Sequence, residues 1–375
     1  MVQAWLKVEE NPTRTVQGFL RSLLEKEVVE ALLVPAPSVG GESVTPTLFL
    51  SPNELSVAEP FAPLMPVSEA TAVSMLTRTG NPLRLGAVMR NCQIRALVEL
   101  VKFKQAQLDN LIIIGVDCPG TYELRDYEEL VRKGVEPSAQ LLEVIAKREI
   151  GVNSGLPFRE ACRMCAYPIP DPSIAAITVG ILGFDGEKIP VLVRDDLAEK
   201  LGLADGSPSA QREEVIRSLS EAKKAERGKQ IERFSKEGAG LEGLLRWFSK
   251  CIRCYNCMGV CPICYCRECV FRTPVFEHES ARYFDWAQKK GALQLPPEHL
   301  LFHLTRMNHM VTSCVGCGLC TSACPADIDV ALAFQSVGEG VQALFNYVPG
   351  RSLEEPAPVQ TFQEREFVEL GETLK

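Results

Sequence analysis

The chain of 375 residues has no long apolar run, no basic run and no recognisable secretory start. No stretch approaches the roughly 18 uninterrupted apolar residues that a membrane-spanning helix needs, so we expect no membrane span. Its 40 Lys+Arg and 48 Asp+Glu leave a net charge of −8 without any Lys/Arg-rich run, which argues against nucleic-acid binding. The opening MVQAWLKVEENPTR has no basic segment followed by an apolar core, so we expect a cytoplasmic protein.

Histidine is also scarce, because the chain has only four, all between residues 278 and 309. No Ser/His/Asp or Cys/His set for nucleophilic catalysis is apparent, and we therefore assign no catalytic residue. We expect each histidine to be packed, capping or exposed rather than to bind a metal.

Cysteine is the residue that the chain does have in quantity, with 15 in all. An odd number cannot pair completely into disulfides, and a chain this long is not a small disulfide-stapled domain. The cysteines are also unevenly placed: seven lie within residues 251–269 and four within residues 314–324. This pattern indicates a reducing compartment and cysteines that bind metal.

The chain divides near residue 205, where GLADGSPSAQ is typical of a turn-rich boundary. The charged, helix-forming SAQREEVIRSLSEAKKAERGKQIERFSKE that follows predicts a solvated helical connector rather than a binding surface. We predict an α/β domain, this connector, a helical two-cluster ferredoxin-type domain and an extended C-terminal tail, at residues 1–205, 206–250, 251–335 and 336–375.

The first domain alternates predicted helices and strands, which favours an α/β fold with a mostly parallel sheet. A helix is predicted over 15–29, followed by the strand EALLVPA that Pro35 and Pro37 should end. RLGAVM and LDNLIIIGVDC are the next buried strands, and a helix lies between them. Cys92 and Cys118 each follow a strand end, where ligands gather in such sheets, so the two could share a site.

The pattern C-x2-C-x2-C-x3-C-P occurs twice in the second half of the chain, and it is the run that binds cubane iron–sulfur clusters in bacterial ferredoxins. The first run is Cys251, Cys254, Cys257 and Cys261, and the second run is Cys314, Cys317, Cys320 and Cys324. In two-cluster ferredoxins the fourth cysteine of each run ligates the other cluster. The predicted second cluster site is therefore Cys251, Cys254, Cys257 and Cys324, and the third cluster site is Cys314, Cys317, Cys320 and Cys261.

Structural zinc is the alternative for these runs, but zinc uses two C-x-x-C pairs and has no need of two three-plus-one runs. The 52 residues between the runs (262–313) have helical periodicity and predict a helix-bundle ferredoxin domain rather than a compact β-rich one. Three cysteines of that insert remain over: Cys264, Cys266 and Cys269. They could bind metal, shield a cluster or pack as small apolar side chains, and we favour roles other than ligand.

Four cysteines of the first domain are left after this assignment: Cys92, Cys118, Cys162 and Cys165. Four thiols suffice for a third cubane. On spacing alone, a redox-active C-x-x-C or a single zinc ion fits ACRMC nearly as well, so these alternatives stay open.

Several segments together resemble a known family. MRNCQIRALVEL, IIIGVDCPGT and ACRMC, in that order, resemble the beta subunits of formate dehydrogenases and of hydrogenases that reduce the deazaflavin coenzyme F420. CIRCYNCMGVCPICYCRECVF, HLTRMNHMVTSCVGCGLCTSACPADID and FNYVPG are closely similar to the C-terminal region of the formate dehydrogenase beta subunits. The resemblance implies three 4Fe-4S clusters, with Cys92, Cys118, Cys162 and Cys165 as the N-terminal cluster site, and an FAD beside that cluster.

The sequence departs from the family pattern in two glycine-bearing segments. RTVQGFLRSLL keeps only Gly18 where the family has a cysteine and two glycines, and AAITVGILGF has Ala176 in place of an acidic residue. Gly180 and Gly183 survive in the second segment and are our candidate flavin contacts, because a flavin needs close backbone approach there.

The predicted function is that of an iron–sulfur and flavin electron-transfer subunit of an oxidoreductase. The resemblance implies a molybdopterin formate dehydrogenase alpha subunit, or a hydrogenase subunit, as the catalytic partner, and coenzyme F420 or another carrier as acceptor. The alternative is a flavin-free relay that links a dehydrogenase to a heterodisulfide-reductase-like complex, which the altered glycine segment mildly favours. A zinc-stabilised scaffold without redox function is a remote third hypothesis.

Overall fold

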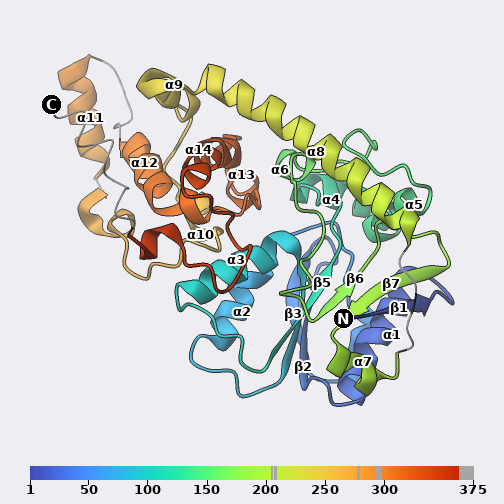
Figure 1. Ribbon diagram of the computed structural model, residues 1–375. Helices are drawn as coiled ribbons and strands as arrows, with labels where there is room; N and C mark the ends of the chain where they lie inside the picture. The colour runs from blue at the N-terminus through green and yellow to red at the C-terminus, as the bar shows by residue number, and fades with distance from the viewer. Residues whose placement is uncertain (204–205, 207–208, 277–278, 292–297, 363–375) are drawn as a thin grey trace.

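A computed structural model describes residues 1–203, 206, 209–276, 279–291 and 298–362. Seven strands form one sheet in the order β1-β7-β6-β5-β4-β2-β3. Their bounds are β1 Val2–Lys7, β2 Ala31–Pro37, β3 Val44–Phe49, β4 Leu85–Arg90, β5 Leu111–Val116, β6 Ile177–Val179 and β7 Lys188–Val193. The sheet forms one end of the molecule, and helices that follow residue 210 form the other end (Figure 1).

The prediction of a mostly parallel sheet is wrong, because the sheet is mixed. β2, β4, β5 and β6 pair in parallel at its centre. β3 pairs antiparallel with β2 at one edge, and β7 and β1 pair antiparallel at the other. The short connections β2–β3 and β6–β7 make these pairs antiparallel, since a parallel pair requires a longer crossover.

The helices of the first domain are α1 Pro12–Glu25, α2 Glu69–Thr77, α3 Asn91–Lys102, α4 Leu124–Arg132, α5 Pro137–Ala146, α6 Glu160–Arg163 and α7 Asp195–Leu201. Those that follow are α8 Ala210–Glu237, α9 Gly240–Trp247, α10 Asn256–Gly259, α11 Ser280–Lys290, α12 Glu298–Met310, α13 Leu319–Ser322 and α14 Val330–Leu344. Short 3-10 helices occur at Pro52–Val57, Val270–Arg272, Pro274–Phe276, Val311–Ser313 and Pro358–Gln360. No helix in these described ranges combines the length and apolar character needed to cross a membrane.

The strand β2 runs through both of its prolines, although they were predicted to end it. Pro35 lies opposite Pro46 of β3, so neither residue needs an amide donor at that step of the ladder. The parallel partner β4 pairs only with residues 31–33, so the prolines leave that ladder intact as well.

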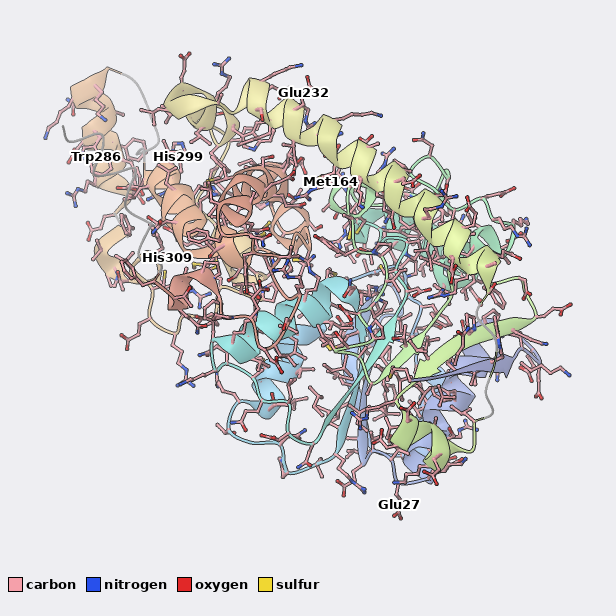
Figure 2. All side chains as sticks on the ribbon, in the orientation of Figure 1. Glu27, Met164, Glu232, Trp286, His299 and His309 are labelled. Carbon is pink, nitrogen blue, oxygen red and sulfur yellow. The ribbon has the colours of Figure 1, made fainter. Side chains whose placement is uncertain are left out.

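Two hydrophobic cores lie on the two faces of the sheet. One contains α1, α4, α5 and α7. The other joins α2, α3 and the buried faces of β4 and β5 to the cysteine-bearing helical region, including Phe302 and Phe334. Met164, 2% exposed, belongs to this second core and lies between the two ends of the molecule (Figure 2). The cysteines of both regions thus meet across a continuous core.

The helix α8 is the predicted connector, but it is more than a solvated one. It runs along both ends of the molecule (Figure 1) and is tied to each by charged side chains. Lys223 is 2% exposed and donates to the Pro119 carbonyl at 2.6 Å and the Cys162 carbonyl at 2.9 Å. Arg227 donates to Gln335 at 2.8 Å and Glu339 at 2.9 Å on α14. α8 therefore fixes the two ends of the molecule relative to one another.

The helix α14 continues to Leu344, past the start of the predicted extended tail at residue 336. Beyond it, the chain returns to α3. The Tyr347 hydroxyl at 2.5 Å and the Gly350 amide at 2.8 Å both donate to the buried Glu99 carboxylate. Burial and then the Glu99 hydrogen bond raise the pKa of Tyr347, so the hydroxyl stays protonated and can donate. Residues 363–375 of the predicted tail lie outside the described residues.

Candidate metal centres

The second cluster site is a small cavity in the helical region, bordered by α10 and α12. Cys251, Cys254, Cys257 and Cys324 all line it, although Cys324 belongs to the second run. Burial raises the pKa of Cys257 to about 11, and charges on Cys251, Cys254 and Cys324 add to that effect. The structure therefore brings together the four cysteines of the crossed arrangement.

The backbone curls in the same way in both runs. The residues two and four positions after the first cysteine have left-handed φ: Arg253 (58°) and Tyr255 (61°) in the first run, Gly316 (74°) and Gly318 (79°) in the second. Alternation of right- and left-handed residues turns successive amides toward one point and makes an anion-binding hollow, as found at many iron–sulfur sites. This backbone suits a negatively charged cluster held by thiolates.

The third cluster site lies deeper in the molecule. Burial raises the pKa of Cys317 to about 12, and the charges of Cys261 and Cys314 raise it further. Burial likewise raises the pKa of Cys320 well above its ordinary value, with contributions from Cys317, Cys261 and Cys314. Cys261 of the first run is thus a close electrostatic neighbour of three cysteines of the second run.

The N-terminal cluster site is formed at the carboxyl ends of two adjacent parallel strands. Arg90 at the end of β4 pairs with Val116 at the end of β5, and the cysteines follow each by two residues. Cys162 lies in α6 and Cys165 follows it. Burial raises the pKa of Cys92 far above its ordinary value, followed by the charges of Cys118, Cys317, Cys165 and Cys162. All four cysteines are brought together, with the third cluster site beside them.

Buried cations surround these sites, and the sequence analysis did not identify them. Arg306 donates to the Cys257 sulfur at 3.2 Å, and Arg159 donates to the Cys162 sulfur at 3.5 Å. His303 Nε2 lies 3.4 Å from the Cys251 sulfur, and burial followed by Arg306 lowers its pKa to about 3, so it is neutral. One sequence signal did exist: His303 and Arg306 fall among the core positions of the amphipathic α12.

The surroundings fit anionic cubane clusters. Thiolates in an apolar interior are costly unless cations and hydrogen-bond donors compensate them. Several buried polar atoms, two of them on these arginines, have no partner within the described residues: His303 Nδ1, Arg159 Nε, Arg306 Nε, Thr312 Oγ1 and Ser313 Oγ. Donors of this kind near the sulfurs are among the features that adjust a cluster's potential.

No three His, Cys, Asp or Glu side chains in the described ranges gather closely enough to hold a single metal ion. Ligands of a cubane stand at separate iron corners, so they are spaced more widely than the ligands of one ion.

The leftover cysteines also lie near a cluster site. Burial raises the pKa of Cys264 to about 11, followed by the charge of Cys261, and Cys266 and Cys269 contribute further. Cys269 is 4.0 Å from the Met258 sulfur.

The candidate flavin glycines do not fit a flavin in this structure. A Cβ added to Gly180 would lie 2.8 Å from the Arg212 guanidinium carbon, and one added to Gly183 would lie 2.5 Å from the Arg212 Cα. Arg212 also pairs with Asp117 at 3.0 Å and donates to the Leu182 carbonyl at 2.7 Å. The close approach that these glycines allow is therefore taken by α8 of the same chain.

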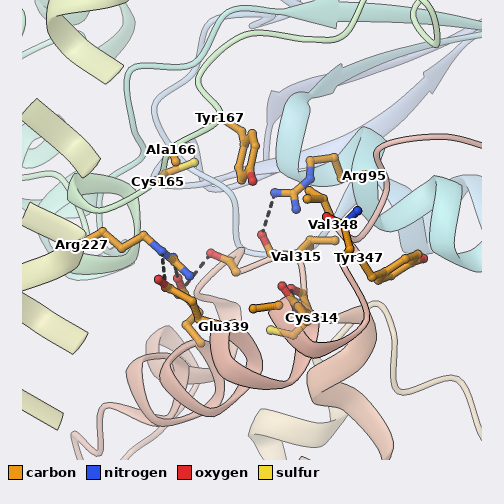
Figure 3. A pocket seen from close by; sticks show the side chains of 15 residues that line it. Arg95, Cys165, Ala166, Tyr167, Arg227, Cys314, Val315, Glu339, Tyr347 and Val348 are labelled. Carbon is orange, nitrogen blue, oxygen red and sulfur yellow. Dashed lines mark hydrogen bonds and ion pairs between the residues drawn. The ribbon is translucent and has the colours of Figure 1, made fainter. Parts of the chain in front are cut away.

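An open hollow of about 310 Å³ lies between the N-terminal and third cluster sites. Cys165 and Cys314 reach it from opposite sides, and Tyr167, Arg95 and Arg227 border it (Figure 3). The Arg95 guanidinium lies 4.1 Å from the centre of the Tyr167 ring. The hollow gives solvent a route to both cluster sites, where the two ends of the molecule meet.

Comparison with known proteins agrees with this arrangement. Residues 247–328 match the family model described as a 4Fe-4S dicluster domain. The F420-dependent formate dehydrogenase subunit beta of Methanocaldococcus jannaschii is 25% identical over 365 residues, covering 89% of this chain and 91% of that protein. Along most of its length the chain is similar to formate dehydrogenase beta subunits. The F420-dependent formate dehydrogenase 1 subunit beta of Methanococcus maripaludis is 28% identical over 372 residues, covering 91% of each.

The predicted resemblance is thereby confirmed, as is the prediction of an oxidoreductase component. The comparisons support 4Fe-4S clusters in the second half of the chain. A solved structure of the F420-reducing nickel–iron hydrogenase complex from Methanosarcina barkeri matches with a TM-score of 0.44 and 11% identity. That match covers 64% of this chain and 94% of the other, and it is too weak to support an argument.

Proposed function

We propose that the chain is an iron–sulfur electron-transfer subunit that holds three 4Fe-4S clusters in a row. The observation that carries this proposal is the gathering of twelve cysteines into three neighbouring sets, each with buried cations or donors beside its sulfurs. Clusters of this type supply one-electron transfer when bound. The chain itself supplies the thiolates and places the third cluster site between the other two.

The order of the sites suggests where electrons enter and leave. Cys254 of the second cluster site is exposed, which suits entry from a partner at the far end of the helical region. We propose that this partner is the catalytic subunit of a formate dehydrogenase or hydrogenase, in keeping with the names of the relatives. The N-terminal cluster site lies at the other end of the row, beside the hollow of Figure 3. We propose coenzyme F420, or another carrier, as the acceptor there, in a cytoplasmic complex.

The FAD implied by the family resemblance is a separate part of the proposal. Gly180 and Gly183 give it no direct support, because both pack closely against Arg212 of the same chain. We therefore keep FAD as a prediction to be tested and assign it no contact residue. No electron-transfer step in the proposal depends on it.

The closed glycine segment favours a second candidate, a flavin-free relay. In this form the three clusters alone would link a dehydrogenase to a second redox protein, such as a heterodisulfide-reductase-like complex. Arg212 forms its ion pair with Asp117, whose carboxylate also accepts from the Ile181 and Leu182 amides at 3.0 Å each. These contacts satisfy the Ile181 and Leu182 amides, while Thr178 Oγ1 of the same segment is buried without a partner in the described residues.

Cofactor content tests both candidates. Protein purified without oxygen should contain about 12 iron atoms and as many acid-labile sulfides per chain, four for each of three cubanes. Zinc with negligible iron would contradict the proposal. Flavin released on denaturation would select the flavin-containing form, and its absence after reconstitution with FAD would select the relay.

A further inference from the structure

Two buried arginines lie between successive cluster sites. Arg159 and Arg306 are each only 4% exposed. Neither has a carboxylate within ion-pair distance in the described part of the chain, whereas the buried side chains of Arg90 and Lys102 lie beside Glu69 and Glu99. A guanidinium that is buried without a carboxylate is costly, so a different anion must compensate it.

Arg306 lies between the second and third cluster sites. One of its nitrogens donates to the Cys257 sulfur at 3.2 Å and the other to the Cys257 carbonyl at 3.1 Å. The rings of Phe334 and Phe302 lie 4.8 Å and 5.5 Å from its guanidinium carbon and keep water away. Burial alone lowers the pKa of Arg306, but charges on Cys257, Cys261 and Cys320 raise it overall. Its anionic neighbours thus belong to both sites.

Arg159 has the same position between the third and the N-terminal cluster sites. One nitrogen donates to the Cys162 sulfur at 3.5 Å and to the Cys317 carbonyl at 3.2 Å. The other donates to the Ser322 hydroxyl at 3.2 Å. Burial by itself lowers the pKa of Arg159, but charges on Cys162, Glu123 and Cys317 raise it overall. This side chain thus joins the first domain to the second run.

We propose that Arg306 and Arg159 are positioning residues of the relay, each holding the reduction potentials of the two clusters beside it. The proposal rests on the proposed function, because it requires the clusters. Reduction adds an electron to a cluster that is already anionic. A fixed cation in a low-dielectric interior stabilises that electron and offsets the repulsion between adjacent reduced clusters. Each arginine therefore raises two potentials, and the third cluster is raised by both.

The test is a redox titration of the anaerobic holoprotein, followed by electron paramagnetic resonance, with iron measured in every sample. The variants are Arg306→Gln, Arg306→Lys, Arg159→Gln and Arg159→Lys. Arg132→Gln is the matched control, since Arg132 is exposed on α4 and paired with Glu42 and Glu128. We expect each Gln variant to lower two of three midpoints, one of them common to both variants. The expected change in the ratio of reduced to oxidised cluster is at least tenfold, which is about 59 mV for one electron.

Each result decides the matter. Lys variants and the control should keep all three midpoints, because the charge is retained or was never near a cluster. Unchanged midpoints in Gln variants with full iron would overturn the proposal, as would iron loss in the Gln and Lys variants alike, which would make the role structural. Loss of iron from a Gln variant whose Lys counterpart keeps both its iron and normal midpoints would support the proposal, because it would show that the cluster requires the positive charge. Absence of iron from the unmodified protein would instead contradict the proposed function.

Discussion

The two cysteine runs have the same spacing and the same backbone curl, yet their surroundings differ. At the two left-handed positions the first run carries Arg253 and Tyr255, and the second carries Gly316 and Gly318. A side chain in this conformation costs roughly 1 to 2 kcal/mol, so the first run tolerates a strain that the second avoids.

Packing explains the difference. A Cβ on Gly318 would lie 2.4 Å from the Ala161 Cβ, and one on Gly316 would lie 3.0 Å from Gln335 Oε1. The second run is therefore pressed between α6 of the first domain and α14. The first run lies at the outer end, where Arg253 pairs with Glu298 and donates to the Tyr283 hydroxyl at 2.6 Å. The cysteine spacing sets the backbone curl in both runs, and the neighbouring residues decide whether a side chain fits at the left-handed positions.

The largest effect should come from removing the fourth cysteine of either run. Cys324→Ala should remove the cluster built on the first run, and Cys261→Ala the one built on the second, because each fourth cysteine lies with the other run. Iron analysis should show a loss of up to about four atoms per chain in each variant, and spectroscopy should show which cluster is missing. Loss of the cluster of its own run in either variant would refute the crossed assignment.

A smaller effect should follow from giving the second run a side chain. Gly318→Ala combines a left-handed φ with a clash against Ala161, and should destabilise the holoprotein by about 2 to 4 kcal/mol. Thermal loss of the cluster absorbance measures this as a lower midpoint temperature. Gly340→Ala is the control, since Gly340 lies in α14 with open space around it and should be neutral or slightly stabilising. Equal stability of the two variants would contradict the packing argument.

Oxygen should destroy the clusters of the two runs at different rates, because their cysteines differ in solvent exposure. Cys254 is exposed, whereas the cysteines of the second run are not, and oxidation of thiolates follows exposure. Brief exposure to air should therefore destroy the cluster of the first run before that of the second. Electron paramagnetic resonance at intervals after exposure would measure the two decays, and simultaneous decay would show that exposure is not the cause.

The smallest effect is expected at Tyr255. The centre of its ring lies 4.9 Å from that of Phe302 and 6.3 Å from that of Phe271. The ring rather than the hydroxyl should therefore contribute to stability. Tyr255→Phe should change stability by no more than about 0.5 kcal/mol. Tyr255→Gly relieves the left-handed strain but loses these ring contacts, so a net loss is expected. A net gain would mean that strain outweighs packing in the first run.

Much of the candidate site follows from local sequence. The spacing of the two runs predicts their curled backbones, and the apolar strand patterns predict that Cys92 and Cys118 follow strand ends. The helix α8 was also predicted, because a charged segment rich in helix formers has a strong local preference. Its role was not predicted, since burial of Lys223 and the pairing of Arg212 depend on what the helix packs against.

The sheet shows the same division. The central strand patterns were visible in the sequence, but the edge strands β1 and β3 and the neighbouring strand β7 were not, and their antiparallel pairing makes the sheet mixed. Pro35 was expected to stop β2 because a proline lacks an amide donor. In the structure Pro35 faces Pro46 of β3, so no amide donor is required at that step. The sequence of either segment alone does not reveal which residues face each other across the hairpin.

Cysteine count and spacing alone predicted a metal-binding, electron-transferring protein, because thiols two residues apart can surround a cluster with few choices of backbone. The places of Arg159, Arg306 and Arg212 came only from the folded chain. Most of their partners lie far away in sequence, as Cys317 does from Arg159 and Asp117 from Arg212, and the effect of a buried charge depends on the groups that surround it. For that reason the sequence could predict the cysteines of the cluster sites, while the structure was needed to find the cations beside them.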